Sequence, residues 1–256
     1  MRQKVRKSIL LFSMALFPVT MNYMSPYVIV NGSFEGIIAG SFLFFGLLFV
    51  SSLFLGRAFC GWLCPAGGVQ EACFPMKGKK VKGKKRFIKY AIWAPWIATI
   101  AVAAVRAGGY HAVEPLYLTD SGVSVDSIYK LVIFLFVLAL FFTLSVTVGK
   151  RAGCHTVCWM APFMVIGRRL GMLLHVPSIK LNPEAGRCVS CKRCETRCPM
   201  SLSVNAMVKR GSMANDDCIV CGECADACSE KAIRFGFGIV RPVEKELVSC
   251  AEEPLR

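Results

Sequence analysis

The chain has 256 residues, of which 55% are hydrophobic, and a formal net charge of +15. Its mean hydropathy of +0.52 is higher than that of ordinary soluble domains and indicates a membrane protein. The basic residues do not gather on a recognisable nucleic-acid-reading module, so we expect no nucleic-acid partner. Fourteen cysteines would imply disulfides in a secreted chain, but cysteines that hold iron and sulfide belong in a reducing compartment. We therefore expect the cysteine-rich parts to face the cytoplasm.

The N-terminal part contains two apolar segments that we predict to cross the membrane. The first runs from Ser8 to about Met24 after four basic residues, and is expected to be a retained helix with a cytoplasmic N-terminus and a kink at Pro18. Residues 25–35 contain no Lys or Arg, which predicts an outside loop. The second segment, 36–55, is long enough to cross roughly 30 Å of hydrocarbon and returns the chain to the cytoplasm.

Two further apolar segments follow a strongly basic stretch. From Lys77 to Lys89 there are eight basic residues in thirteen and no acidic one, and the positive-inside rule places this loop in the cytoplasm. The third segment spans about Ile88 to Val105 and the fourth Ile128 to Val148. We therefore predict an all-α bundle of four transmembrane helices, surrounded by membrane lipid, in a bacterial-type cytoplasmic (inner) membrane. Both termini are expected in the cytoplasm.

The second and fourth segments are each followed by a C-x3-C motif. The second motif lies 94 residues after the first, and the dipeptide Arg-Ala precedes both in the same register. We interpret this as an internal repeat in which a unit of two helices and one C-x3-C motif occurs twice. The four cysteines are Cys60, Cys64, Cys154 and Cys158.

If each motif is helical, its two cysteines share one face, and the repeat places the two pairs opposite each other at the cytoplasmic end of the bundle. Four converging thiolates suit a third iron–sulfur centre. Binding of copper or zinc, dithiol chemistry and simple burial of cysteine remain alternatives. His155, inside the second motif, is a candidate auxiliary ligand or an ordinary polar residue.

The C-terminal part contains two complete C-x2-C-x2-C-x3-C runs. This spacing is typical of bacterial ferredoxins with two [4Fe-4S] clusters, in which the last cysteine of each run binds the other cluster. Structural zinc sites instead combine separated cysteine pairs. The first predicted cluster is bound by Cys188, Cys191, Cys194 and Cys228, and the second by Cys198, Cys218, Cys221 and Cys224.

The expected domains follow from these motifs. Residues 1–176 form the transmembrane domain, including the basic loop and an interfacial amphipathic helix from 162 to 176. Residues 177–238 form a small α+β ferredoxin-like domain, in which 231–235 is expected to be a short closing strand. Residues 239–256 form a C-terminal tail.

The combination of four membrane helices, two C-x3-C motifs and a two-cluster ferredoxin resembles the NapH/NosR/MauN-type membrane ferredoxins. The resemblance covers nearly the whole chain. It implies electron transfer between membrane quinol and iron–sulfur partners, often for an extracytoplasmic reductase. The chain lacks the large flavin-binding domain of the NosR branch and any C-x-x-C-H haem motif, so the resemblance favours a short NapH-like form that works with other redox proteins.

The predicted function is that of an electron-transfer subunit of a quinol dehydrogenase-like oxidoreductase rather than of a stand-alone enzyme, since no hydrolytic, nucleophilic or phosphate-binding motif is present. Its cofactors are two [4Fe-4S] clusters, with a third iron–sulfur or metal centre and quinone as further candidates. The main alternative is a copper-reducing, copper-delivering or oxidoreductase-assembly factor, and a redox sensor is a third. The sequence does not set the direction of electron flow.

Overall fold

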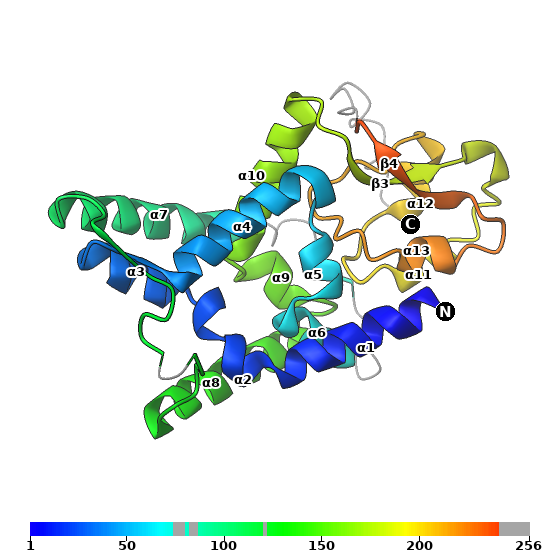
Figure 1. Ribbon diagram of the computed structural model, residues 1–256. Coiled ribbons are helices and arrows are strands. Elements are labelled where there is room, and N and C mark those ends of the chain that lie inside the picture. The colour runs from blue at the N-terminus through cyan, green and yellow to red at the C-terminus, as the bar shows by residue number, and fades with distance from the viewer. Residues whose placement is uncertain (74–79, 82–86, 120–121, 241–256) are drawn as a thin grey trace.

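The computed structural model describes residues 1–73, 80–81, 87–119 and 122–240. It is mostly helical, with two small two-stranded sheets (Figure 1). Most of the predicted basic loop, and the predicted tail from residue 241 onward, lie outside the described residues.

The N-terminal segment forms two consecutive helices, α1 (Arg2–Ala15) and α2 (Phe17–Thr20). Pro18 lies in the first turn of α2, where its missing N–H costs nothing, so the helix is interrupted near the predicted kink. A 3₁₀ turn, η1 (Asn22–Met24), leads into α3 (Pro26–Phe34).

Helix α3 corrects the prediction of a loop over residues 25–35. Pro26 starts the helix at a position that favours proline, and α3 then buries Val28 and Ile29. It packs against α7 (Ile88–Arg106). The absence of Lys and Arg from this segment therefore reflects its packing in a helix rather than a solvated loop.

The helix of the second predicted span, α4 (Gly40–Leu55), begins later than expected. Residues 37–39 form strand β1 (Ile37–Ala39), which pairs in parallel with β2 (Ala112–Glu114). Because backbone groups of 37–39 bond across this pair, they are unavailable to a helix. The fourth predicted segment forms α8 (Ile128–Thr147).

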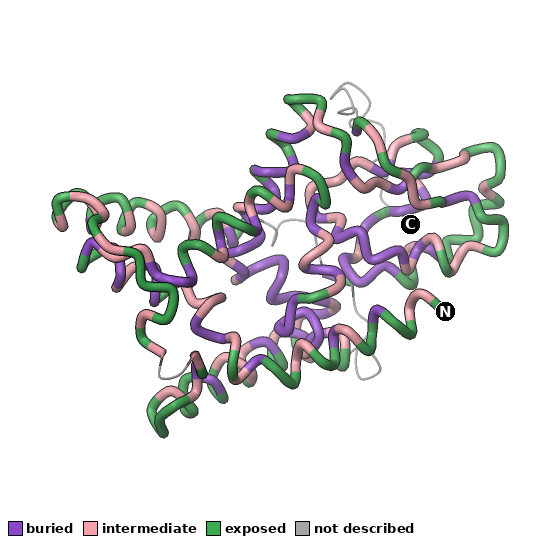
Figure 2. Tube along the Cα trace, viewed as in Figure 1, coloured by how far each residue is buried: buried purple, intermediate pink, exposed green. Residues whose placement is uncertain are grey.

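Helices α7 and α8 are the two helices in the described residues that are long and apolar enough to cross a membrane, with 19 and 20 residues. Only 11% of each apolar window is buried within the protein, whereas a core helix of a soluble protein is mostly covered. Figure 2 shows both helices largely in the colours of exposed and intermediate residues. Helix α4 has 16 residues and is a shorter apolar helix.

Helix α10 (Met160–Leu173) packs closely against α4. A Cβ on Gly167 would lie 2.0 Å from Ser52 Oγ, and one on Gly171 would lie 2.8 Å from the carbonyl oxygen of Leu53. Two small residues four positions apart thus allow the two helices to approach closely. One face of the helix predicted to be interfacial is in this way covered by α4.

The C-terminal region is built around the antiparallel pair β3 (Ser178–Pro183) and β4 (Ile233–Gly238). Strand β4 starts two residues later than the expected closing strand. Between the strands lie a 3₁₀ turn and three short helices: η3 (Ala185–Arg187), α11 (Arg193–Arg197), α12 (Val204–Lys209) and α13 (Glu223–Asp226).

One hydrophobic core joins the helical part to this C-terminal region, and it contains cysteines of both. In Figure 2 the buried residues concentrate where the short helices of the two parts meet. The N-terminus lies at this end as well, since Arg2 and Gln3 both bond to Asp226 (Figure 1).

Candidate iron–sulfur centres

The two C-terminal cysteine runs have matching backbone conformations. The first has positive φ angles at Ser190 and Lys192, and the second has them at Val220 and Gly222, thirty residues later in each case. In both runs the third cysteine lies in a short helix, α11 or α13. The left-handed residues curve each loop around a common centre.

Each run closes with a cysteine from the other. One cavity is lined by the first predicted set, Cys188, Cys191, Cys194 and Cys228. A second is lined by the other set, Cys198, Cys218, Cys221 and Cys224. The structure therefore brings together the same two groups of four that the spacing predicts.

The two cavities differ in exposure. In the first, Cys191 is exposed, whereas Cys198, Cys221 and Cys224 of the second are buried. Burial raises the pKa of Cys221 to about 12. A thiolate at this site therefore needs a positively charged partner, and the iron atoms of a cluster are one.

The four cysteines of the two C-x3-C motifs, which we call the membrane-edge cysteines after their predicted position, lie in two loops of the same conformation. Cys60 is in α5 (Ala58–Trp62), and Cys64 caps α6 (Pro65–Ala72). The backbone N–H groups of residues 63 and 64 both donate to the carbonyl of Phe59, and those of residues 157 and 158 both donate to that of Gly153.

The prediction that each motif is one helical face is therefore wrong. The helix ends between the two cysteines of each motif, and α9 (Ala152–Thr156) stops before Cys158. In the first motif the reason is Pro65, because a residue before proline avoids the helical region, and Cys64 has φ −70° and ψ 117°. Both cysteines of each motif nevertheless point into the core.

All four of these cysteines are buried in one place. Burial raises the pKa of Cys64, and the neighbouring thiols of Cys60, Cys154 and Cys158 raise it further. The two loops also touch each other through equivalent contacts. Cys60 Sγ lies 3.5 Å from Met164 Sδ, while Gln70 Nε2 donates to Cys154 Sγ at 3.2 Å.

These two contacts are related by the internal repeat. Met164 lies 94 residues after Gln70, the same spacing that relates Cys154 to Cys60. Each copy of the repeat therefore presents its first cysteine to the same position of the other copy. The four thiols occupy the centre of a pseudo-twofold arrangement.

Among the described residues, no three His, Cys, Asp or Glu side chains lie close enough together to hold a single metal ion. This holds for the eight C-terminal cysteines as well as for the four at the membrane edge. A mononuclear site gathers its sulfur ligands about 2.3 Å from one ion, whereas a four-iron cube separates them more widely. Four cysteine thiolates are the usual ligands of such a cube.

A network of buried charges surrounds the membrane-edge cysteines. Arg6 donates to both carboxylate oxygens of Glu71 at 2.8 Å, and Arg151 donates to Glu71 and to the carbonyl of Cys60, each at 2.5 Å. All three side chains come from segments far apart in the chain. The arginines lower the pKa of Glu71, although its burial alone would raise it.

A second ion-pair group centres on Asp217, the residue before Cys218. Lys89 Nζ donates to Asp217 Oδ1 at 2.7 Å, and Arg57 Nη1 donates to the same oxygen at 3.3 Å. Burial raises the pKa of Asp217, but Lys89 and Arg57 outweigh it and lower the pKa to about 2. Lys89, predicted as part of a solvated basic loop, is therefore a buried partner of the C-terminal region.

Sequence reasoning missed both ion-pair groups. The one available signal was that Arg57 and Arg151 occupy equivalent positions of the repeat. His155 is also completely buried, and its proximity is one of the causes that lower the pKa of Asp217.

The membrane-edge loops contact the second cysteine set directly. Trp62 Nε1 donates to the carbonyl of Val220 at 3.1 Å, and a Cβ on Gly61 would lie 2.3 Å from the carbonyl oxygen of Ile219. Both carbonyl groups belong to residues between Cys218 and Cys221. The backbone at Gly61 therefore packs directly against the backbone at Ile219.

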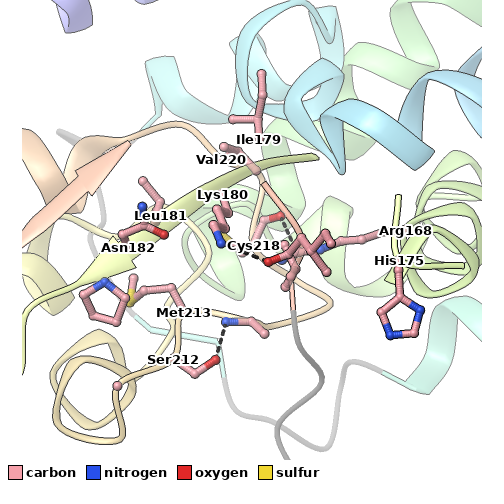
Figure 3. A pocket seen from close by; sticks show the side chains of 15 residues that line it. Arg168, His175, Ile179, Lys180, Leu181, Asn182, Ser212, Met213, Cys218 and Val220 are labelled. Carbon is pink, nitrogen blue, oxygen red and sulfur yellow. Dashed lines mark hydrogen bonds between the residues drawn. The ribbon is translucent and has the colours of Figure 1, made fainter. Parts of the chain in front are cut away.

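A cavity of about 880 Å³ lies beside Cys218, between β3 and residues 211–214. Arg168 reaches into it from α10 and donates to the carbonyl oxygen of Cys218 at 3.4 Å (Figure 3). It also donates to the carbonyl oxygen of Asn215 at 2.8 Å. Lys180 lines the same cavity. This opening exposes one edge of the second cysteine set to a basic surface.

Two family models match the two cysteine-bearing parts. A 4Fe-4S binding domain matches residues 38–85, which include Cys60 and Cys64, and a 4Fe-4S dicluster domain matches residues 187–233, which include all eight C-terminal cysteines. An uncharacterized protein of Methanocaldococcus jannaschii is 27% identical over 204 residues, covering 75% of this chain and 76% of the relative.

Two named relatives match as well. The putative electron transport protein YccM of Escherichia coli is 25% identical over 231 residues, covering 84% of this chain and 60% of YccM. The ferredoxin-type protein NapH of Haemophilus influenzae is 24% identical over 193 residues, covering 70% of this chain and 62% of NapH. The chain is therefore similar to ferredoxin-type electron transport proteins over most of its length.

These similarities confirm the resemblance drawn from the sequence, and this ferredoxin-type chain is an iron–sulfur electron transport protein that binds 4Fe-4S clusters. No solved structure matches it.

Proposed function

We propose that the chain is the membrane-embedded electron-transfer subunit of an oxidoreductase, carrying electrons between cytoplasmic [4Fe-4S] clusters and a membrane quinol pool or an extracytoplasmic redox partner. Its residues form three centres in series. Cys188, Cys191, Cys194 and Cys228 bind the outer cluster, and Cys198, Cys218, Cys221 and Cys224 bind the inner one. The membrane-edge centre, a third iron–sulfur cluster, is bound by Cys60, Cys64, Cys154 and Cys158.

The observation that carries this proposal is the direct junction between Gly61 and Ile219. It leaves no solvent layer between the inner cluster site and the membrane-edge cysteines, which share one hydrophobic core. Exposure falls along the series, from the exposed Cys191 to the buried Cys221 and Cys60. Such a gradient suits electron exchange with a soluble partner at one end and with the membrane at the other.

The proposed topology has four crossings, formed by α1 with α2, α4, α7 and α8. The length and exposed apolar surface of α7 and α8 support it. Contact of Arg2 and Gln3 with Asp226 supports placement of the N-terminus on the same side as the ferredoxin-like region, 177–238. Residues 1–176 are then the membrane domain.

A cavity of about 730 Å³ supports the quinol link. It opens between α1, α6 and the ferredoxin-like region. Its apolar wall is formed by Leu10, Leu11 and Met14, and its polar wall by Lys7, Glu71, Lys150, Thr196, Arg197 and Glu223. Its volume lies in the range of small-molecule sites, in which an apolar surface holds the ligand and polar groups orient it. The position next to α6 places it near the loop that bears Cys64.

A bound cluster supplies the capacity to take up and release one electron. The protein holds it through thiolates, shields it from water by burial, and tunes it through hydrogen bonds to sulfur. Two donors of this kind face the outer site: the backbone N–H of Ala232 lies 3.4 Å from Cys228 Sγ, and Asn205 Nδ2 lies 3.6 Å from Cys188 Sγ.

Reoxidation by quinone tests the proposal. Dithionite-reduced protein in lipid nanodiscs is mixed anaerobically with a short-chain quinone, and cluster absorbance is followed by stopped flow. We expect wild type and Cys73→Ala, which changes a buried cysteine outside the three sets, to reoxidise at the same rate. The double variant Cys60→Ala/Cys154→Ala should be at least about tenfold slower, because its relay to the membrane is interrupted. Equal rates in all three proteins would contradict a relay through the membrane-edge centre.

A further inference from the structure

The region around the membrane-edge cysteines contains more buried positive than negative charge. Glu71, Asp217 and Glu223 are the carboxylates that pair with its cations. A buried charge without a counter-ion is strongly unfavourable, so the excess of cations calls for an anionic occupant. The buried cations are Arg6, Arg57, Lys89, Arg151 and Arg168.

The surroundings of Arg57 indicate where this anionic group binds. Its side chain is completely buried, yet only Nη1 is engaged, with Asp217 and the carbonyl of Asp216. Its Nε and Nη2 have no hydrogen-bond partner among the described residues. Two buried donors without acceptors are unfavourable unless something else accepts hydrogen bonds from them.

The nearest anionic chemistry is that of the cysteines. Arg57 interacts electrostatically with the thiols of Cys60, Cys158 and Cys154. Arg151, its equivalent in the repeat, interacts with those of Cys154 and Cys64 and also with that of Cys221 in the inner set. Its Nε is likewise without a partner among the described residues. Together, the two arginines interact electrostatically with all four membrane-edge cysteines.

The other two groups beside the cysteines cannot supply this charge. Gln70 and Met164, which contact Cys154 and Cys60, are both neutral. A [4Fe-4S]²⁺ core with four thiolates carries two negative charges and presents sulfur acceptors on every side. The negative charge of this cluster would balance the two arginines, and its sulfur atoms would accept hydrogen bonds from the N–H groups left without a partner in the described part of the chain.

We propose that Arg57, together with Arg151, is the counter-charge of the membrane-edge cluster, with Arg57 Nε and Nη2 donating to its sulfur atoms and raising its reduction potential. This inference rests on the proposed iron–sulfur centre at the four cysteines. Reduction adds one electron, supplied by the inner cluster, and hence one negative charge. A fixed positive charge in a low-dielectric site stabilises the reduced form more than the oxidised form. The membrane-edge cluster is thereby made an acceptor for electrons from the ferredoxin-like region.

An EPR-monitored redox titration of the full chain in nanodiscs tests the role of Arg57. We expect Arg57→Gln to retain the iron of the third cluster and to shift its midpoint potential to more negative values. Arg57→Lys keeps the charge but not the two-donor geometry, so its shift should be smaller. Arg169→Gln is the matched control, because Arg169 also pairs with Asp216 but is 63% exposed, and it should leave the potential unchanged.

A second variant should shift the midpoint potential of the membrane-edge cluster in the opposite direction. Asp217→Asn removes the carboxylate that balances Arg57, so the same potential should move to more positive values even where Arg57→Gln fails to assemble the cluster. An unchanged potential in both Arg57→Gln and Asp217→Asn would overturn the role of Arg57 while leaving the third cluster in place. A wild type without any third signal would instead contradict the proposed centre itself, and the inference with it.

Discussion

Replacement of Glu71 by glutamine is expected to lower the free energy of unfolding by about 3–5 kcal/mol. This is the usual cost of removing one charged partner from a buried ion pair. Glu71 accepts from Arg6 and Arg151, whose side chains are 1% and 0% exposed. Neither arginine can turn to water when the carboxylate is lost. Two buried positive charges are then left with less compensation.

The effect is measured as the unfolding temperature of the anaerobically purified protein. For a chain of this size the expected fall is between about 6 and 20 °C. Glu184→Gln is the control, because Glu184 pairs with Arg187 and Arg234 on the surface, where its side chain is 42% exposed and a pair contributes about 0–1 kcal/mol. Equal shifts for the two variants would show that the Glu71 network does not support the fold.

Replacement of Gly61 by alanine is expected to separate the membrane-edge loop from the inner cluster site. The added Cβ would lie 2.3 Å from the backbone oxygen of Ile219, a group that cannot rotate away. Such overpacking costs about 1–3 kcal/mol. The Trp62–Val220 hydrogen bond next to it should be lost as well.

The control for this substitution is Gly46→Ala in α4, where a Cβ would meet nothing within 4 Å. We expect Gly61→Ala to unfold at lower temperature and to be cleaved faster by protease between the membrane and ferredoxin-like parts. Gly46→Ala should match wild type in both assays. Protease resistance and an unfolding temperature equal to those of wild type in Gly61→Ala would contradict the close junction.

The ferredoxin-like cysteines could be grouped from the sequence because their spacing is local. Three ligands within seven residues, such as Cys188 to Cys194, leave the chain little choice of conformation, and the fourth follows from the repeated run. The pairing of the membrane-edge loops was also predictable, since a 94-residue repeat relates Cys60 to Cys154. What the repeat could not predict was the break inside each motif, which Pro65 explains in the first motif only.

Other features depend on contacts that no local pattern encodes. Helix α3 was missed because a segment without Lys or Arg suits an outside loop and a buried helix equally well. Lys89 and Arg6 looked like charges that flank membrane helices, yet each reaches a carboxylate 128 or 65 residues away. Ion pairs of that separation can be identified only once the fold brings their segments together.

The central claim is that four cysteines at the membrane edge bind a third iron–sulfur cluster. Its most direct test is the iron and acid-labile sulfide content of anaerobically purified wild type and of Cys60→Ala/Cys154→Ala. Three [4Fe-4S] clusters predict about twelve iron per wild-type chain, falling to about eight in the double variant. A content of about eight in both proteins would contradict the claim, because the two ferredoxin clusters alone account for it.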